Sequence, residues 1–261
     1  MDSVNKTLYI PLYGKALVSR KGIILQDRKA EEIWAKEQFP LRGKARSKML
    51  AYYTAMRAVA FDKWLQDKIS VDLDCIVLHL GCGMDSRAER VQADSIPWYD
   101  IDFPAVIAER KRYFQENDAY TMLGTDLKDD AFIQALPSAK RAVIIMEGVS
   151  MYLTNGELQA LFARLGERYP SIALLVDCYT PFAEKMSKFR NPVKSVGVNR
   201  VFGVASPAIL ETNTKLRFVG ERAITPKRCI DELKGFERLV FRRMYAGKIS
   251  KKLYKLYEYE K

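Results

Sequence analysis

The chain has 261 residues, 48% of them hydrophobic, which is enough for one domain with a sizeable core. Its net charge of +11 raises the question of nucleic acid, but the basic residues are scattered and are dense only at 188–200 and 241–255. No apolar run reaches the roughly 18 residues of a membrane span, and the N-terminus does not resemble a signal peptide, so we expect a cytoplasmic protein without membrane contact.

The few cysteines and the single histidine restrict the chemistry. The four cysteines form no CxxC pair and lie mostly in apolar runs, which indicates reduced, buried thiols. His79 lies inside an apolar run, so we expect a core or supporting role for it. A His-dependent catalytic triad and a His-rich metal site are therefore excluded, and we predict no metal.

The first 70 residues are predicted to be helical. The segments AEEIWAKEQF and KMLAYYTAMRAVAFDKWLQDKI place apolar residues three and four positions apart. We predict that 1–70 forms a helical N-terminal lid and that 71–261 forms a catalytic domain.

Apolar runs alternate with helical segments from residue 75 onward. Runs buried on both faces, with helices between them, are typical of parallel strands joined by crossovers. Pro104 and the sequence Thr154-Asn155-Gly156-Glu157 indicate helix starts after the second and fourth runs. The five predicted strands are CIVLHL (75–80), IPWYDID (96–102), AYTML (119–123), AVIIMEG (142–148) and SIALLVDCY (171–179).

The regular alternation of predicted strands and helices stops after the fifth strand. Residues 180–205 are polar and basic, and we interpret them as an insertion that covers the site. Further strands are predicted at 216–224 and 253–260, with a helix over FERLVFRRMYA between them. The fold class is thus α/β: a Rossmann-like, doubly wound, mostly parallel seven-stranded sheet.

Polar groups follow each of the first four strands. In an open parallel sheet, ligands bind beyond the carboxyl ends of the strands. The candidate residues are Gly81, Cys82, Gly83 and Asp85 after the first strand, Asp102 after the second, Asp126 and Leu127 after the third, and Glu147 after the fourth.

These acids discriminate between cofactors. A dinucleotide turn has G-x-G-x-x-G, but here Ser86 takes the third glycine position and Asp85 would repel a pyrophosphate. S-adenosylmethionine (SAM) has no phosphate and carries an ammonium, ribose hydroxyls and a sulfonium. Asp102 would accept hydrogen bonds from both ribose hydroxyls, and Asp126 would accept one from the adenine amino group. Asp85 would act through the turn. Each acid alone would also suit a helix N-cap, but four at successive strand ends favour a site.

Four segments carry a resemblance to the leucine carboxyl methyltransferase family, which includes O-methyltransferases of polyketide biosynthesis. They are LHLGCGMDSR, WYDIDFPAVIAERKR, GTDLKDD and IIMEGVSMYLTNGEL. The resemblance implies a class I SAM-dependent methyltransferase with a helical lid and an insertion after the fifth strand. It also implies that Arg57 binds the SAM carboxylate, with Lys15 as a second basic residue. Ser86 stands where the family usually has Thr.

The predicted reaction is O-methylation of a carboxylate or hydroxyl on a small molecule or a peptide C-terminus. We expect Glu147 to bind the SAM ammonium and Tyr152 to line the methyl-transfer pocket. Arg87 would either pair with Asp85 or contact an acidic substrate. The alternatives are an RNA methyltransferase that uses the basic surface, an inactive SAM-binding protein, and an NAD-dependent enzyme. The pattern specifies neither the acceptor nor an oligomeric state.

Overall fold

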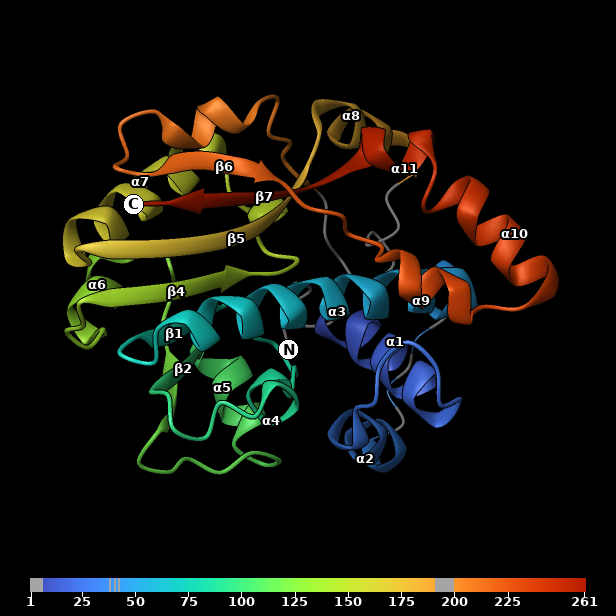
Figure 1. The fold of residues 1–261 in the computed structure, drawn as a ribbon, viewed down its shortest axis with the longest axis horizontal. Coiled ribbons are helices and arrows are strands. Elements are labelled where there is room, and N and C mark those ends of the chain that lie inside the picture. The colour runs from blue at the N-terminus through green and yellow to red at the C-terminus, as the bar shows by residue number, and fades with distance from the viewer. Residues whose placement is uncertain (1–6, 38, 40, 42, 191–199) are drawn as a thin grey trace.

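The computed structural model describes residues 7–37, 39, 41, 43–190 and 200–261. Its centre is a seven-stranded sheet in the order β3-β2-β1-β4-β5-β7-β6 (Figure 1). Strands β1 to β5 are parallel, and β7 is antiparallel to both of its neighbours. The predicted mostly parallel sheet is therefore confirmed. The strands are β1 (Ile76–Leu80), β2 (Trp98–Asp102), β3 (Tyr120–Gly124), β4 (Arg141–Met146), β5 (Ser171–Tyr179), β6 (Arg217–Glu221) and β7 (Tyr254–Glu260).

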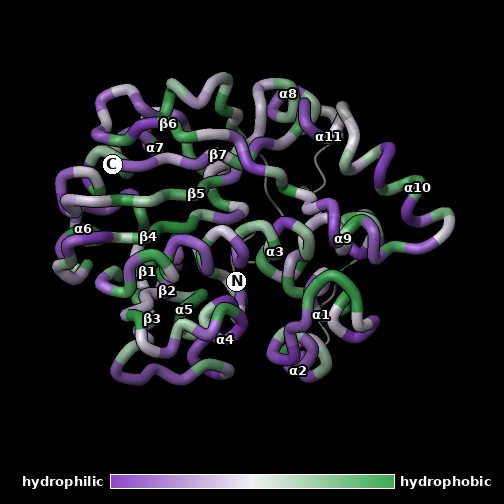
Figure 2. Tube along the Cα trace, in the orientation of Figure 1, coloured by the Kyte–Doolittle hydropathy of each residue, from purple (hydrophilic) through white to green (hydrophobic). Residues whose placement is uncertain are grey.

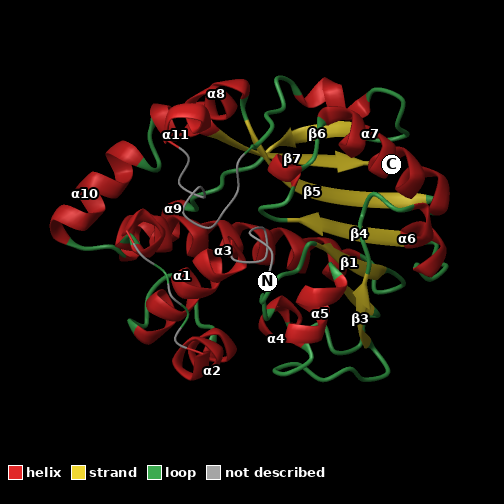
Figure 3. Cartoon of the chain, turned by 180° about the vertical axis from the view of Figure 1, so that it is seen from behind, coloured by secondary structure: helices red, strands yellow, loops and turns green. Residues whose placement is uncertain are grey.

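Helices cover both faces of the sheet, as the front and back views show (Figures 1 and 3). The helices are α1 (Tyr9–Arg20), α2 (Arg28–Glu37), α3 (Lys48–Val71), α4 (Arg87–Val91), α5 (Pro104–Arg110), α6 (Asp130–Ala135), α7 (Asn155–Arg168), α8 (Pro181–Arg190), α9 (Lys227–Glu232), α10 (Gly235–Met244) and α11 (Lys248–Leu253). Short 3₁₀ helices occupy Gly43–Arg46, Ser150–Tyr152 and Pro207–Glu211.

The continuous apolar runs reflect burial on both faces of the central strands. In β1, Leu78 belongs to a cluster that also holds Phe162 of α7, whereas the next-door Val77 belongs to a cluster with Phe61 of α3. Figure 2 shows the same feature as hydrophobic colour along β4 and β5. Successive side chains point to opposite faces, so a strand between two helical layers must be apolar at every position.

Local signals place two of the crossover helices. The Thr154 hydroxyl accepts from the Glu157 amide at 3.2 Å, and the Glu157 carboxylate accepts from the Thr154 amide at 2.7 Å. This capping box satisfies two of the free amides at the start of α7. Pro104 occupies the first position of α5, where a missing amide hydrogen has no consequence.

Helix α3 joins the N-terminal helices to the sheet. Its first half packs Tyr52 and Met56 against α1 and α10, and its second half packs Trp64 and Leu65 into the cluster on the sheet. The N-terminal helices therefore share a core with the sheet. The division into a lid (1–70) and a catalytic domain (71–261) stays a prediction.

The connections after β5 differ in detail from the sequence-based expectation. Helix α8 begins the predicted cover at 180–205, but 191–199 lie outside the described residues. Strand β6 is shorter than predicted, and its pairing with β7 shifts register between Phe218 and Gly220. No helix in the described part of the chain is long and apolar enough to span a membrane.

Candidate active site

The glycine turn after β1 brings two loops close together. Gly81 has φ +71°, and a Cβ there would lie 2.2 Å from Cγ2 of Val149, in the loop after β4. Gly83 has φ +52°. Only glycine adopts such φ values without strain, and only glycine leaves room for Val149. The two glycines thus narrow the crevice at the carboxyl ends of β1 and β4.

Asp85 lies in this turn, enclosed by three cations. Its Oδ1 is 2.5 Å from Nζ of Lys15 and 2.6 Å from Nη1 of Arg90, and its Oδ2 is 3.0 Å from Nη2 of Arg87. Burial alone would raise the pKa of Asp85, but Arg90, Lys15 and Arg87 hold it well below its usual range. The carboxylate therefore stays ionised and ties α1 and α4 to the glycine turn.

Asp102 ends β2 and faces the same cavity. One of its carboxylate oxygens accepts from the Gly83 amide and the other from the Phe103 amide, each at 2.8 Å. Burial raises its pKa despite these bonds. Since a carboxylate oxygen accepts more than one hydrogen bond, both oxygens keep capacity for a ligand.

Asp126 and Leu127 follow β3 and line the other end of the cavity. The Asp126 carboxylate accepts from the Lys128 amide at 3.0 Å, which holds the loop in a turn. Leu127 packs into the core while one side of it lines the cavity.

Arg57 of α3 makes three polar contacts. Its Nε is 2.9 Å from Glu147, and its Nη1 is 2.8 Å from Asp177 and 3.0 Å from the hydroxyl of Tyr254. Nη2 lies beside Gly148, where a Cβ would be 3.2 Å away. Arg57 also lines the cavity, so a guanidinium already fixed by the protein faces the ligand space.

Arg87 is fully buried beneath the cavity. It pairs with Asp62 at 2.7 Å, with Asp85 and with Glu147. Of the two predicted roles, the structure shows the pairing with Asp85, and Arg87 does not line the cavity. Glu147 is held between Arg57 and Arg87. Burial alone would raise the pKa of Glu147, but the two arginines hold it below its usual value.

These contacts form one connected, buried ion-pair network. Every member is within 4.0 Å of at least one other. Four cations face five carboxylates, so the network is formally one positive charge short. Its cations are Lys15, Arg57, Arg87 and Arg90, and its carboxylates are Asp27, Asp62, Asp85, Glu147 and Asp177.

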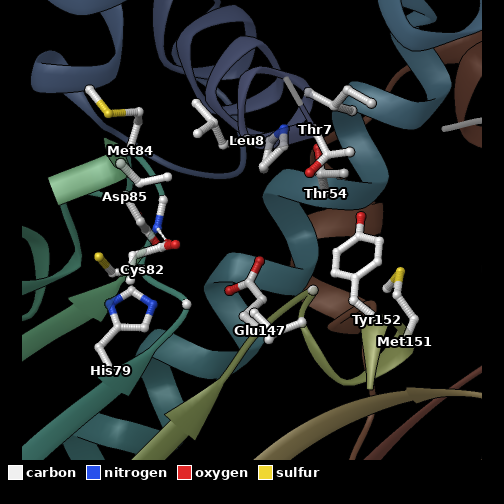
Figure 4. A pocket seen from close by; sticks show the side chains of 18 of the residues that line it. Thr7, Leu8, Thr54, His79, Cys82, Met84, Asp85, Glu147, Met151 and Tyr152 are labelled. Atoms are coloured by element: carbon white, nitrogen blue, oxygen red, sulfur yellow. Dashed lines mark hydrogen bonds between the residues drawn. The ribbon is translucent and has the colours of Figure 1, made fainter. Parts of the chain in front are cut away.

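Aromatic side chains close the end of the cavity beside β4, β5 and β7. Tyr53, Tyr152, Tyr179 and Tyr254 line it from four different elements. The rings of Tyr179 and Tyr254 meet edge to face at 4.8 Å. Burial raises the pKa of Tyr152. Figure 4 shows Tyr152 extending toward Thr7 and Thr54, on the far side of Glu147 from Asp85.

His79 lies below the glycine turn in a satisfied arrangement. Its Nδ1 is 3.0 Å from Asp100, which also accepts from Trp98 at 2.8 Å and from Tyr120 at 2.5 Å and pairs with Arg110. These contacts fit the expected supporting role and leave Asp100 with no free oxygen.

All of the predicted site residues line a single cavity of about 430 Å³. This volume is within the usual range for a small-molecule site. Tyr179 and Tyr254 line its walls and were not predicted, and neither was Asp177, which is fully buried behind the wall and holds Arg57. Asp177 lies within the apolar run of β5, two residues before its end, and a single acid among apolar residues is the only sequence signal for it. Tyr254 begins β7, whose antiparallel position no local pattern reveals.

The strand order, with an antiparallel β7, and a cavity at the carboxyl ends of the parallel strands agree with the class I SAM-dependent methyltransferase fold that the motifs predicted. The family model for leucine carboxyl methyltransferase matches residues 3–166. The chain belongs to the leucine carboxyl methyltransferase family, as its motifs predicted.

A relative supports this assignment, and solved structures share the fold. The chain is 30% identical over 222 residues to the tetracenomycin polyketide synthesis O-methyltransferase TcmP of Streptomyces glaucescens, covering 84% of this chain and 82% of the relative. A crystal structure of a Thermobifida fusca YX protein superposes with a TM-score of 0.61 at 12% identity, covering 97% and 94%. Magnesium protoporphyrin IX methyltransferase from Synechocystis PCC 6803, with bound SAH, superposes with a TM-score of 0.54 at 12% identity, covering 88% and 93%. The last two show the shared fold.

Proposed function

We propose that this methyltransferase transfers a methyl group from SAM to the carboxylate of a small apolar acid. The observation that carries the proposal is the lack of a free base at the tyrosine-lined end of the cavity. Among the described lining residues there, Glu147 is held by two arginines with a lowered pKa, and burial raises the pKa values of the tyrosines. A carboxylate is already ionised and needs no base, whereas an alcohol does.

The cofactor would lie along the cavity from β3 to β4. We assign Asp102 to the ribose hydroxyls, Asp126 to the adenine amino group and Glu147 to the ammonium. Arg57, already fixed by its protein partners, would hold the SAM carboxylate. The remaining predicted contacts are the walls at Gly81, Cys82, Gly83 and Leu127, and the basic side chain of Lys15 beside Asp85.

The charge of the network supports SAM. SAM carries an ammonium, a sulfonium and a carboxylate, hence one net positive charge. The network lacks one positive charge, so bound SAM would leave the buried cluster neutral. An uncompensated buried charge is costly, and its neutralisation favours binding.

The chain's contribution to the reaction is positioning and exclusion of water. SAM supplies an electrophilic methyl group on a sulfonium. The tyrosine wall would orient the acceptor carboxylate for in-line attack, and the buried cavity would strip water from that carboxylate. We assign Tyr152, next to Glu147 in the lining, to this wall. The helices of residues 1–70 would act as the lid, with Leu8 and Ile10 of that segment already in the lining.

The test is a matched acceptor screen with SAM. Aryl and alkyl acids are compared with the alcohols of the same skeleton, and methyl esters are measured. We expect acids to be methylated with a kcat/KM that stays level between pH 6 and 8. Methylation of the alcohols but not of the acids would contradict the proposal. Titration calorimetry with SAM and NAD separates a methyltransferase from an NAD enzyme.

The remaining alternatives are tested separately. A steep salt dependence of RNA binding, together with methyl transfer to RNA, would support an RNA methyltransferase instead.

We also propose a cytoplasmic location. The four cysteines are all buried and unpaired, which supports it.

A further inference from the structure

More than half of the net positive charge of this protein lies in one appendage. Residues 227–253, which form α9, α10 and α11 between β6 and β7, contain nine Lys or Arg and only three Asp or Glu. The segment thus carries +6 of the chain's +11. Figure 1 shows α10 at the periphery of the molecule, remote from the sheet.

The three acids of this appendage are already engaged. Asp231 pairs with Arg238 at 2.5 Å, and Glu237 pairs with Lys48 at 2.6 Å. Glu232 accepts from the Ile24 amide at 2.5 Å. Seven exposed cations of this appendage have no ion-pair partner within the described part of the chain, namely Lys227, Arg228, Lys234, Arg242, Arg243, Lys251 and Lys252.

Large apolar side chains project from the same helix. Phe236 is 78% exposed, Leu239 63% and Met244 57%. Phe236, Leu239 and Arg243 are three and four positions apart, so they share the outer face of α10. On the inner face, Phe241 is fully buried and anchors the helix to the core of the N-terminal helices.

Contrary to the expectation from the sequence of no membrane contact, we propose that α10 and α11 form a docking surface for an anionic lipid membrane. Phe236, Leu239 and Met244 enter the boundary between headgroups and acyl chains, and the unpaired cations face anionic headgroups. A helix with exposed apolar side chains beside Lys and Arg is the usual form of an interfacial anchor. A second copy of this chain would bring two positive faces together, and nucleic acid would leave the apolar side chains without a partner.

The experiment is flotation of the full chain with vesicles of phosphatidylcholine, with and without phosphatidylglycerol. We expect binding only to the anionic vesicles, weakening as salt rises. Arg242→Glu/Arg243→Glu should lower the partition coefficient at least tenfold, since each basic residue near such a surface contributes measurably. Phe236→Ser/Leu239→Ser should lower it as well.

Matched controls keep the interpretation specific. Lys140→Glu/Arg217→Glu makes the same charge change on exposed residues elsewhere, and Val219→Ser removes an apolar side chain that is 48% exposed on β6. These variants should bind vesicles like the wild type. Circular dichroism verifies that every variant is folded, and SAM affinity should be unchanged in all of them, so failure here is distinct from failure of the methyltransferase proposal.

Three results would overturn the proposal. They are equal binding to neutral and anionic vesicles, wild-type binding by the two α10 variants, and an equal loss in the controls. Salt-dependent binding to RNA or to an acidic protein, without binding to anionic vesicles, would also overturn it and assign the surface to that partner.

Discussion

Replacement of Arg57 by methionine tests the buried network and the cofactor assignment together. The change leaves Asp177, which is fully buried, without its cation, and it leaves Glu147 with Arg87 alone. Breaking a buried ion pair from one side costs about 3–5 kcal/mol. For a chain of this size we expect the melting temperature to fall by about 10 °C.

The same substitution should weaken SAM binding. A hydrogen bond between charged groups contributes about 1.5–3 kcal/mol, so loss of the contact to the SAM carboxylate should raise the Kd about 10- to 100-fold. Titration calorimetry measures the Kd at a temperature where the variant is folded, and differential scanning calorimetry measures the stability.

A double variant separates the two effects. In the wild type, the Asp177 carboxylate accepts a hydrogen bond from the Gly148 amide at 2.7 Å. Asp177→Asn keeps the volume of the side chain and the accepting oxygen, but it removes the negative charge that Arg57→Met leaves without a partner. Arg57→Met/Asp177→Asn should therefore recover part of the lost stability without recovering SAM affinity. The reasoning is refuted if Arg57→Met is as stable as the wild type, or if SAM affinity returns in the double variant.

Three further changes probe other parts of the site. Asp102→Ala should raise the SAM Kd about 10- to 100-fold by calorimetry, since two ribose contacts to a carboxylate are lost; an unchanged Kd would remove Asp102 from the site. Folding lowers the pKa values of Asp85 and Glu147. The two carboxylates therefore stabilise the folded protein at any pH above their pKa values in the unfolded chain, and this stabilisation is lost as the pH falls through the folded pKa values. The melting temperature should thus stay level from about pH 8 to 5 and drop below about pH 4; a drop already at pH 6 would contradict this sign. Tyr179→Leu should raise the acceptor KM without changing the SAM Kd, and an altered SAM Kd would move Tyr179 out of the acceptor wall.

Local patterns predicted most of the sheet because its strands are buried on both faces. Leu78 and Val77 are adjacent and both apolar because each meets a different helical layer. The sequence does not show that β7 runs antiparallel between β5 and β6, since that arrangement depends on packing. Helix α4 begins only at Arg87 and has 5 residues, because the preceding residues form the glycine turn.

The site was predictable where topology alone brings residues together. Asp85, Asp102 and Glu147 meet because parallel strands end at one edge. The ion pairs were not predictable in this way. Lys15 reaches Asp85 across 70 positions and Arg87 reaches Asp62 across 25, so these two pairs depend on how α1 and α3 pack.

The missing positive charge of the buried network also bears on turnover. In the proposed binding mode, methyl transfer converts the sulfonium into a neutral thioether, and S-adenosylhomocysteine carries no net charge. The cluster of four cations and five carboxylates then regains an uncompensated negative charge. Bound S-adenosylhomocysteine is thereby destabilised relative to bound SAM. The charge imbalance among these side chains favours replacement of S-adenosylhomocysteine by SAM, which begins the next cycle.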